Sequence, residues 1–173
     1  MHHDPLRLCV RTLLRDLDTL GWDGPVRLYA VQGKDYNPYL RLITAAHLHP
    51  VDLIASAPQL PRRALGVVLT AEAWGWEPSR EQTDHLVTSL RAEGIPLELM
   101  DEAVMQFVRA SLGVIPPSRR PDRYEQRDAY VRLRSGRRML MTAKRGGDPA
   151  ERFGDDWTAP EIETALSLYV GED

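Results

Sequence analysis

A predicted β-hairpin in the C-terminal third of this chain carries most of its excess positive charge. Residues 123–134 and 137–145 have strand character on either side of Ser135 and Gly136, a pair suited to a tight turn. Residues 118–147 hold ten Lys and Arg residues against three acidic ones, a net charge of +7, whereas the rest of the chain is −10. A cationic ribbon on an acidic body predicts that one face of the protein meets an anionic surface.

The turn determines which side chains share a face of this hairpin, because successive residues of a strand alternate between its two faces. With a two-residue turn, one face is expected to carry Tyr130, Arg132, Arg134, Arg137, Met139 and Met141. Arg134 then lies opposite Arg137, a like-charge pair that destabilises the hairpin unless an anion or an acid intervenes. We therefore expect these residues, with Arg123 at the start of the first strand, to form a binding face.

Three interpretations of this cationic face are open. The face docks against an acidic protein, which includes a second copy of this chain; it binds nucleic acid through phosphate contacts and stacking; or its arginines pair with acidic residues of the protein's own helices. The net charge of −3 favours a protein over nucleic acid. We expect a binding protein that contacts a protein partner or self-associates, with nucleic-acid binding as the alternative.

The rest of the chain alternates helix-like and strand-like segments. Asp4-Pro5 and Ser79 with Gln82 are helix-start patterns, and apolar residues recur at helical spacing after both. Helices are expected over residues 4–21, 39–49, 51–57, 79–93 and 96–113, with a final helix that carries Ile162, Leu166 and Tyr169. Buried strands are expected over residues 26–31 and 65–74.

This order of elements does not fit a doubly wound parallel sheet, because a long helical stretch separates two strands and a hairpin follows it. It favours an α+β fold, in which helices pack on a mixed or antiparallel sheet of about four strands and a final helix follows the C-terminal hairpin. A chain of 173 residues has the size of one domain. We expect a single globular domain over residues 1–173, with a Pro-rich crossing at 114–122.

Cysteine content and hydropathy bear on the compartment. The single cysteine, Cys9, has no second thiol in the chain to pair with, as expected in a reducing compartment. The first residues lack the apolar core of a signal peptide, and no apolar run approaches the roughly 20 residues of a membrane helix. We expect a cytoplasmic protein without membrane contact.

His47-Leu48-His49-Pro50 is the candidate metal motif. Two histidines one residue apart can converge on one zinc ion, and the motif resembles part of the signature of zinc metalloproteases that cleave ubiquitin-like tails. That signature implies a serine and an aspartate where this chain has Ala57 and Leu60. His47 and His49 are therefore weak zinc candidates, with His49 interpreted otherwise as a polar cap, and no metal or cofactor is expected.

Glu72, Trp74 and Trp76 place a carboxylate beside two large rings at the end of the second predicted strand. Together with Glu125 they are candidates for a pocket, which makes an enzyme the third interpretation. The alternative is structural, because tryptophans at a strand end commonly close the rim of a core. The chain contains no complete catalytic motif, so an enzyme is the least favoured interpretation.

Two sequence blocks resemble those of small uncharacterised bacterial and bacteriophage proteins. The first is a strand that ends Glu-x-Trp, here Glu72 to Trp74, and the second is Pro-Ser-x-x-Pro-x-Arg-x-Glu, here residues 117–125, before a hairpin. The resemblance covers roughly residues 65–147. It implies that Glu72, Trp74, Arg123 and Glu125 lie together, and it implies no particular activity.

Overall fold

A computed structural model describes residues 4–115, 117–152 and 159–171 of the chain. The chain divides into two compact units: the first comprises Met1–Ala73 and Glu125–Asp173, and the second is Trp74–Tyr124. The second unit is thus inserted in the sequence between two strands of the first. The single domain expected from the sequence stays a prediction, because two compact units can still unfold cooperatively.

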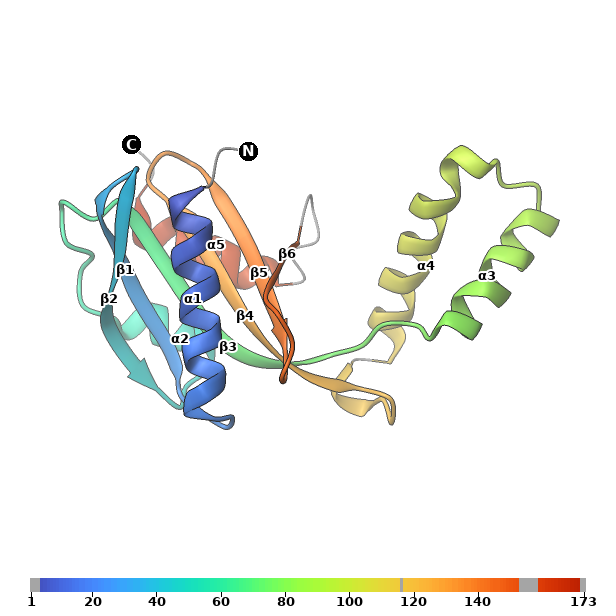
Figure 1. Ribbon diagram of the computed structural model, residues 1–173, viewed down its shortest axis with the longest axis horizontal. Helices are drawn as coiled ribbons and strands as arrows, with labels where there is room; N and C mark the ends of the chain where they lie inside the picture. Colours follow the sequence, from blue (N-terminus) through green and yellow to red (C-terminus); the bar gives the residue numbers. More distant parts are fainter. Residues whose placement is uncertain (1–3, 116, 153–158, 172–173) are drawn as a thin grey trace. The chain divides into compact units, whose positions relative to one another are not determined.

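The first unit is built on one six-stranded antiparallel sheet, so the fold is α+β as predicted and the sheet is wider than the four strands expected (Figure 1). The strand order is β2-β1-β3-β4-β5-β6. The strands are β1 Val26–Lys34, β2 Asn37–Ala46, β3 Gly66–Gly75, β4 Tyr124–Leu133, β5 Arg138–Lys144 and β6 Ala150–Arg152.

Helix α1, Pro5–Leu20, covers one face of this sheet (Figure 1). Asp4 caps it as predicted, because its carboxylate accepts hydrogen bonds from the N–H groups of Leu6 (3.1 Å) and Arg7 (3.4 Å). The apolar stripe of α1 packs on every second residue of the central strands. This core layer contains Leu6, Val10, Leu14, Tyr29, Val31, Val68, Ala129, Val131, Met139 and Met141.

Helices α2, Pro50–Ser56, and α5, Pro160–Val170, cover the opposite face (Figure 1). The second core layer contains Leu28, Leu53, Ile54, Val67, Leu69, Tyr130, Leu140, Ile162 and Leu166. Both faces of the central strands are therefore buried, and every residue over 66–71 of β3 and 127–133 of β4 is removed from water. Strands buried on both faces read as continuous apolar runs, which is why residues 65–74 were recognisable in the sequence.

The helix predicted over residues 39–49 is wrong, because this segment is strand β2. Asn37-Pro38 resembles a helix start and is the basis of that prediction, but it is also compatible with a strand, since β2 is an edge strand, where proline is tolerated. The hairpin with β1 depends on Gly33, whose φ is +96° and whose missing Cβ would lie 2.5 Å from the Asn37 carbonyl oxygen. The three-residue strand β6 was also missed.

The second unit contains two helices, α3 Arg80–Ala92 and α4 Met100–Val114, with short 3-10 turns at Leu97–Leu99 and Pro117–Arg119. The predicted capping box is present: Gln82 N–H donates to the Ser79 hydroxyl (3.2 Å), and Ser79 N–H donates to the Gln82 side chain (2.7 Å). Over the described part of the chain, no helix combines the length and apolarity needed to cross a membrane.

Candidate interaction surfaces

The β4–β5 hairpin has a different register from the one expected. Arg132 pairs with Arg138, and Leu133 N–H donates to the Arg137 carbonyl (2.9 Å), so Arg134 does not lie opposite Arg137. The pairing is shifted by one residue, and a one-residue shift moves every side chain of one strand to the other face. The predicted arrangement of the two faces is therefore wrong.

The corrected register buries much of the predicted binding face. Tyr130 is 4 % exposed, Met139 3 % and Met141 0 %, and Tyr130 lies on the opposite side of the sheet from the two methionines. The hairpin lies between helices on both faces, so these side chains form core rather than a recognition surface. Arg132 is 9 % exposed and also lies within the fold.

Several hairpin arginines are matched by groups of the protein itself and are not left free to meet an external anionic surface. Arg137 pairs with Asp4, Arg138 with Glu163 and Arg145 with Glu125. Arg134 donates to the carbonyl oxygens of Ala64 (3.1 Å) and Val170 (2.8 Å). Asp4 caps α1 and Glu163 lies in α5, so these two pairs correspond to the third interpretation of the cationic segment, whereas Glu125 lies in β4 of the hairpin itself.

Glu72 holds a buried cluster at one end of the α1-covered face. Its carboxylate pairs with Arg127, whose side chain is 2 % exposed, and accepts hydrogen bonds from the N–H groups of Asp23 (2.7 Å) and Gly24 (3.3 Å). The Arg127 guanidinium lies over the Trp22 ring, 4.7 Å from its centroid, and also donates to the Gly21 carbonyl (2.8 Å). Glu72 thus ties the loop between α1 and β1 to the sheet.

Of the four residues expected to lie together, Glu72 and Glu125 belong to the first unit, and Trp74 and Arg123 belong to the second. In the first unit, Glu125 pairs with Arg145, whose guanidinium lies 5.8 Å from the same Trp22 ring. In the second unit, the Arg123 guanidinium lies 4.4 Å from the Trp74 ring. Arg–aromatic stacking of this kind stabilises by about 0.5–1 kcal/mol at exposed sites.

Trp76 has a structural role in the second unit. Its indole N–H donates to the Asp122 carboxylate (2.8 Å), and the Arg120 guanidinium stacks on the ring at 3.8 Å. Arg120 also donates to the carbonyl oxygens of Ser111 (2.8 Å) and Ile115 (2.9 Å) at the end of α4. These contacts join the start of the second unit, at Trp76, to its end, at Arg120 and Asp122, and to the C-terminal end of α4. They agree with the structural alternative for this tryptophan.

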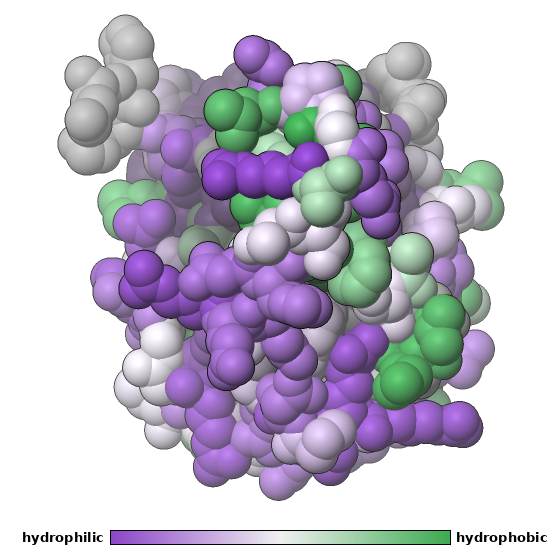
Figure 2. Space-filling model, turned by 90° about the vertical axis from the view of Figure 1, so that its right-hand side faces the viewer, coloured by the Kyte–Doolittle hydropathy of each residue, from purple (hydrophilic) through white to green (hydrophobic). Residues whose placement is uncertain are grey.

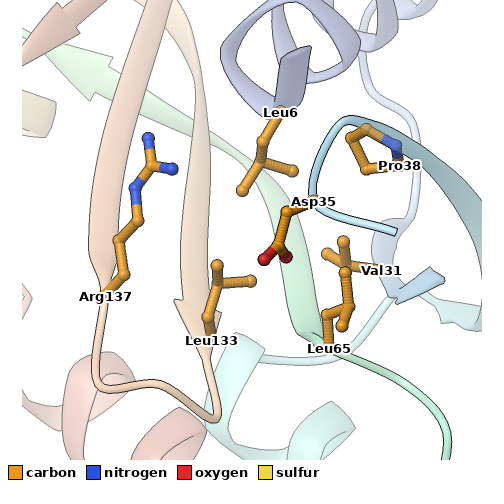
Figure 3. Close-up of a pocket in the computed structure, with 7 residues that line it drawn as sticks. All are labelled: Leu6, Val31, Asp35, Pro38, Leu65, Leu133 and Arg137. Atoms are coloured by element: carbon orange, nitrogen blue, oxygen red, sulfur yellow. The ribbon is translucent and has the colours of Figure 1, made fainter. Parts of the chain in front are cut away.

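The hollow drawn in Figure 3 lies in the first unit, away from the predicted pocket residues. It is lined by Leu6, Val31, Asp35, Pro38, Leu65, Leu133 and Arg137. The Asp35 carboxylate points into it from the β1–β2 turn (Figure 3). Its volume of about 50 Å³ is far below the several hundred Å³ of typical metabolite sites.

The two histidine candidates lie at the start of α2. Both are exposed, and His49 accepts a hydrogen bond from Val51 N–H through Nδ1 (3.4 Å), the capping role offered as the alternative to zinc. Within the described residues, no cluster of three or more His, Cys, Asp or Glu side chains is arranged to hold a metal ion.

Asp128 is a buried carboxylate that the sequence did not single out. It accepts hydrogen bonds from Thr142 (2.9 Å), Gln126 (3.0 Å) and Tyr130 (3.4 Å). Burial raises the pKa of Asp128 above its ordinary value, although these donors and the charge of Arg152 act in the opposite direction. The network explains how polar side chains at Asp128 and Thr142 are accommodated within the core.

Helix α4 carries an apolar face that its own unit covers only in part. Val104, Val108 and Ser111 are half-buried, whereas Phe107 is 50 % exposed and Val114 80 %. Leu97, Leu99 and Ile115, next to the two ends of the helix, are also 47–66 % exposed. Figure 2 shows hydrophobic side chains in separate patches among hydrophilic ones on one side of the molecule. The sequence predicted a helix over residues 96–113, and the exposure of this face required the structure.

No protein-family model, no curated protein and no solved structure matches the chain.

Proposed function

We propose that this is a non-enzymatic binding protein whose interface lies on α4 of the second unit. The interface consists of Ala103, Phe107, Ala110 and Val114, which we call the open seam. These residues recur at spacings of four, three and four, the heptad pattern by which helices pack in bundles. The open seam replaces the hairpin face as the proposed binding surface, because the aromatic and sulphur-containing side chains of the hairpin are core residues.

The observation that carries this proposal is that α4 has two apolar seams and one helical neighbour. The half-buried residues Val104, Val108 and Ser111 form the first seam, and α3 is the other α-helix among the described residues of the unit. The open seam is offset from the first seam by one residue, which at 3.6 residues per turn is a rotation of roughly a quarter turn about the helix axis. Three of its four residues are exposed. A helix with a second apolar seam is typical of a bundle of more than two helices.

The energetic reason is the cost of leaving a large apolar side chain in water. Removing a side chain such as phenylalanine from water contributes about 1.5–3 kcal/mol, and Phe107 and Val114 retain half or more of their surface. Contiguous exposed apolar surface marks protein interaction sites more often than isolated exposed residues do. Occupation of the open seam by a protein recovers this free energy.

Site-specific photo-crosslinking in cells that make the protein tests this function. A benzophenone amino acid at Ala110, on the open seam, is expected to cross-link to protein, whereas the same group at Thr88, exposed on α3, is not. Phe107→Glu should abolish the Ala110 product, because it places a charge in the centre of the interface. Equal cross-linking from Ala110 and Thr88, or none from Ala110, would refute the proposal.

A further inference from the structure

We infer that the partner of the open seam is a second copy of this chain, bound with its α4 antiparallel to the first. This inference rests on the proposed function and adds the identity of the partner. The two copies of α4 would lie side by side about a two-fold axis, with one α3 on the outside of each. A two-fold arrangement of this kind uses the same surface on both copies and is closed, so it ends at the dimer.

The sizes of the seam residues favour antiparallel self-pairing. Small and large side chains alternate along the seam, from Ala103 to Phe107, Ala110 and Val114. In the two antiparallel registers that keep Phe107 within the interface, Phe107 of one copy faces an alanine of the other, Ala103 or Ala110. Parallel pairing instead sets Phe107 against Phe107 and alanine against alanine, which crowds one layer and leaves a void in the next.

The charges around α4 favour the same orientation. Asp101 and Glu102 lie in the first turn of α4, whereas Arg120 lies at its C-terminal end, where it donates to the carbonyl oxygens of Ser111 and Ile115. Antiparallel helices bring the acidic end of one copy to the basic end of the other, whereas parallel helices bring like charges together. Complementary charge of this kind contributes chiefly to orientation and specificity.

Helix α3 offers no competing surface for the second copy. Its half-buried residues Thr83, Leu86, Val87 and Leu90 recur on one side, and its exposed positions are polar or charged except for Ala92. An α3 with one seam and an α4 with two are the components of a four-helix arrangement in which the two copies of α4 lie at the centre.

Sedimentation velocity of the full chain tests the inference. The wild type is expected to be a dimer at micromolar concentration, and Phe107→Glu should weaken it at least about a hundredfold, because each substitution acts twice in a two-fold interface. Val114→Glu, at a position 80 % exposed, is a second disruptive variant that leaves the packing within the unit intact. Thr88→Glu on the polar side of α3 is the matched control, and far-UV circular dichroism should be the same for all three variants.

Orientation is read by cross-linking single-cysteine variants in a Cys9→Ser background with a short bismaleimide. Leu99→Cys and Ile115→Cys, at opposite ends of α4, should cross-link to one another when mixed, and each should give little product alone. A dimer that cross-links at like positions, or one that persists in Phe107→Glu and Val114→Glu, would overturn the inference. A monomeric wild type overturns it as well, and the proposed function still stands in that case if Ala110 cross-links to a different protein.

Discussion

Replacement of Glu72 by glutamine tests whether the Glu72–Arg127 pair holds the loop before β1 onto the sheet. Glutamine has nearly the same shape as glutamate but keeps only one acceptor oxygen, whereas the N–H groups of Asp23 and Gly24 donate to different oxygens of the carboxylate. The substitution therefore disturbs one of these bonds and removes the negative charge beside Arg127, whose side chain is 2 % exposed. The result is an almost fully buried guanidinium with no compensating carboxylate.

The magnitude follows from this burial. Breaking a buried ion pair by removing one partner costs about 3–5 kcal/mol, and the 22 % exposure of the Glu72 side chain places the expected loss near 3 kcal/mol. The further substitution Arg127→Met removes the stranded charge, so the double variant should recover about 2 kcal/mol relative to Glu72→Gln. Urea unfolding followed by circular dichroism measures these differences as shifts of the midpoint at constant slope.

Glu125→Gln is the matched control, because Glu125 pairs with Arg145, which directly follows the neighbouring strand β5 and lies beside the same Trp22 ring. The Arg145 side chain is 62 % exposed, so water solvates it when the carboxylate is gone, and the loss of stability should be far smaller than for Glu72→Gln. Equal losses for the two variants would refute the argument that burial determines the strength of these pairs.

Two further predictions concern carboxylates whose pKa the fold shifts in opposite directions. Burial acts to raise the pKa of Asp4, but the Arg137 guanidinium and the N–H groups of Leu6 and Arg7 outweigh it, so the pKa is lowered. The stability that the Asp4 carboxylate contributes is therefore lost as the pH falls from the ordinary carboxyl pKa through the lowered one. Asp4→Ala should cost about 1 kcal/mol at pH 7 and Asp4→Asn, which keeps the cap, clearly less, as measured by urea unfolding; an equal cost for both would contradict the capping role. Because burial raises the pKa of Asp128, the folded state holds this proton more tightly than the unfolded chain, and stability declines as pH rises from the ordinary carboxyl pKa through the raised one. Asp128→Asn should remove this decline from thermal melts recorded across that range, and an unchanged pH profile would show that Asp128 does not cause it.

Local signals in the sequence were sufficient where neighbouring residues determine the structure. Asp4 with Pro5, and Ser79 with Gln82, begin helices in the structure as they were expected to. A capping side chain acts on N–H groups two or three residues away, so its effect can be predicted without any tertiary information. Strand β3 could also be predicted locally, because burial on both faces requires an uninterrupted hydrophobic segment.

Pairing between strands depended on tertiary context. The segment from Asn37 to Ala46 begins with a pattern that also opens helices, and it became β2 because β1 offers a partner across a tight turn. The register of β4 and β5 was ambiguous for a related reason. Hydrophobic patterning selects a register when one face of a hairpin is polar, but helices cover both faces here, so a one-residue shift still buries apolar side chains on each side.

The sequence by itself determined the starts of α1 and α3, the α+β class and the concentration of arginines in residues 118–147. Only the tertiary structure decided what those arginines meet, because Asp4, Glu72, Glu125 and Glu163 come from segments distant from one another in the chain. Helical spacing likewise marks α4 as apolar, but the spacing is the same whether one neighbour covers that face or two. The exposure of Phe107 and Val114 is therefore a property of the folded chain, which places a single helix beside α4 in its unit.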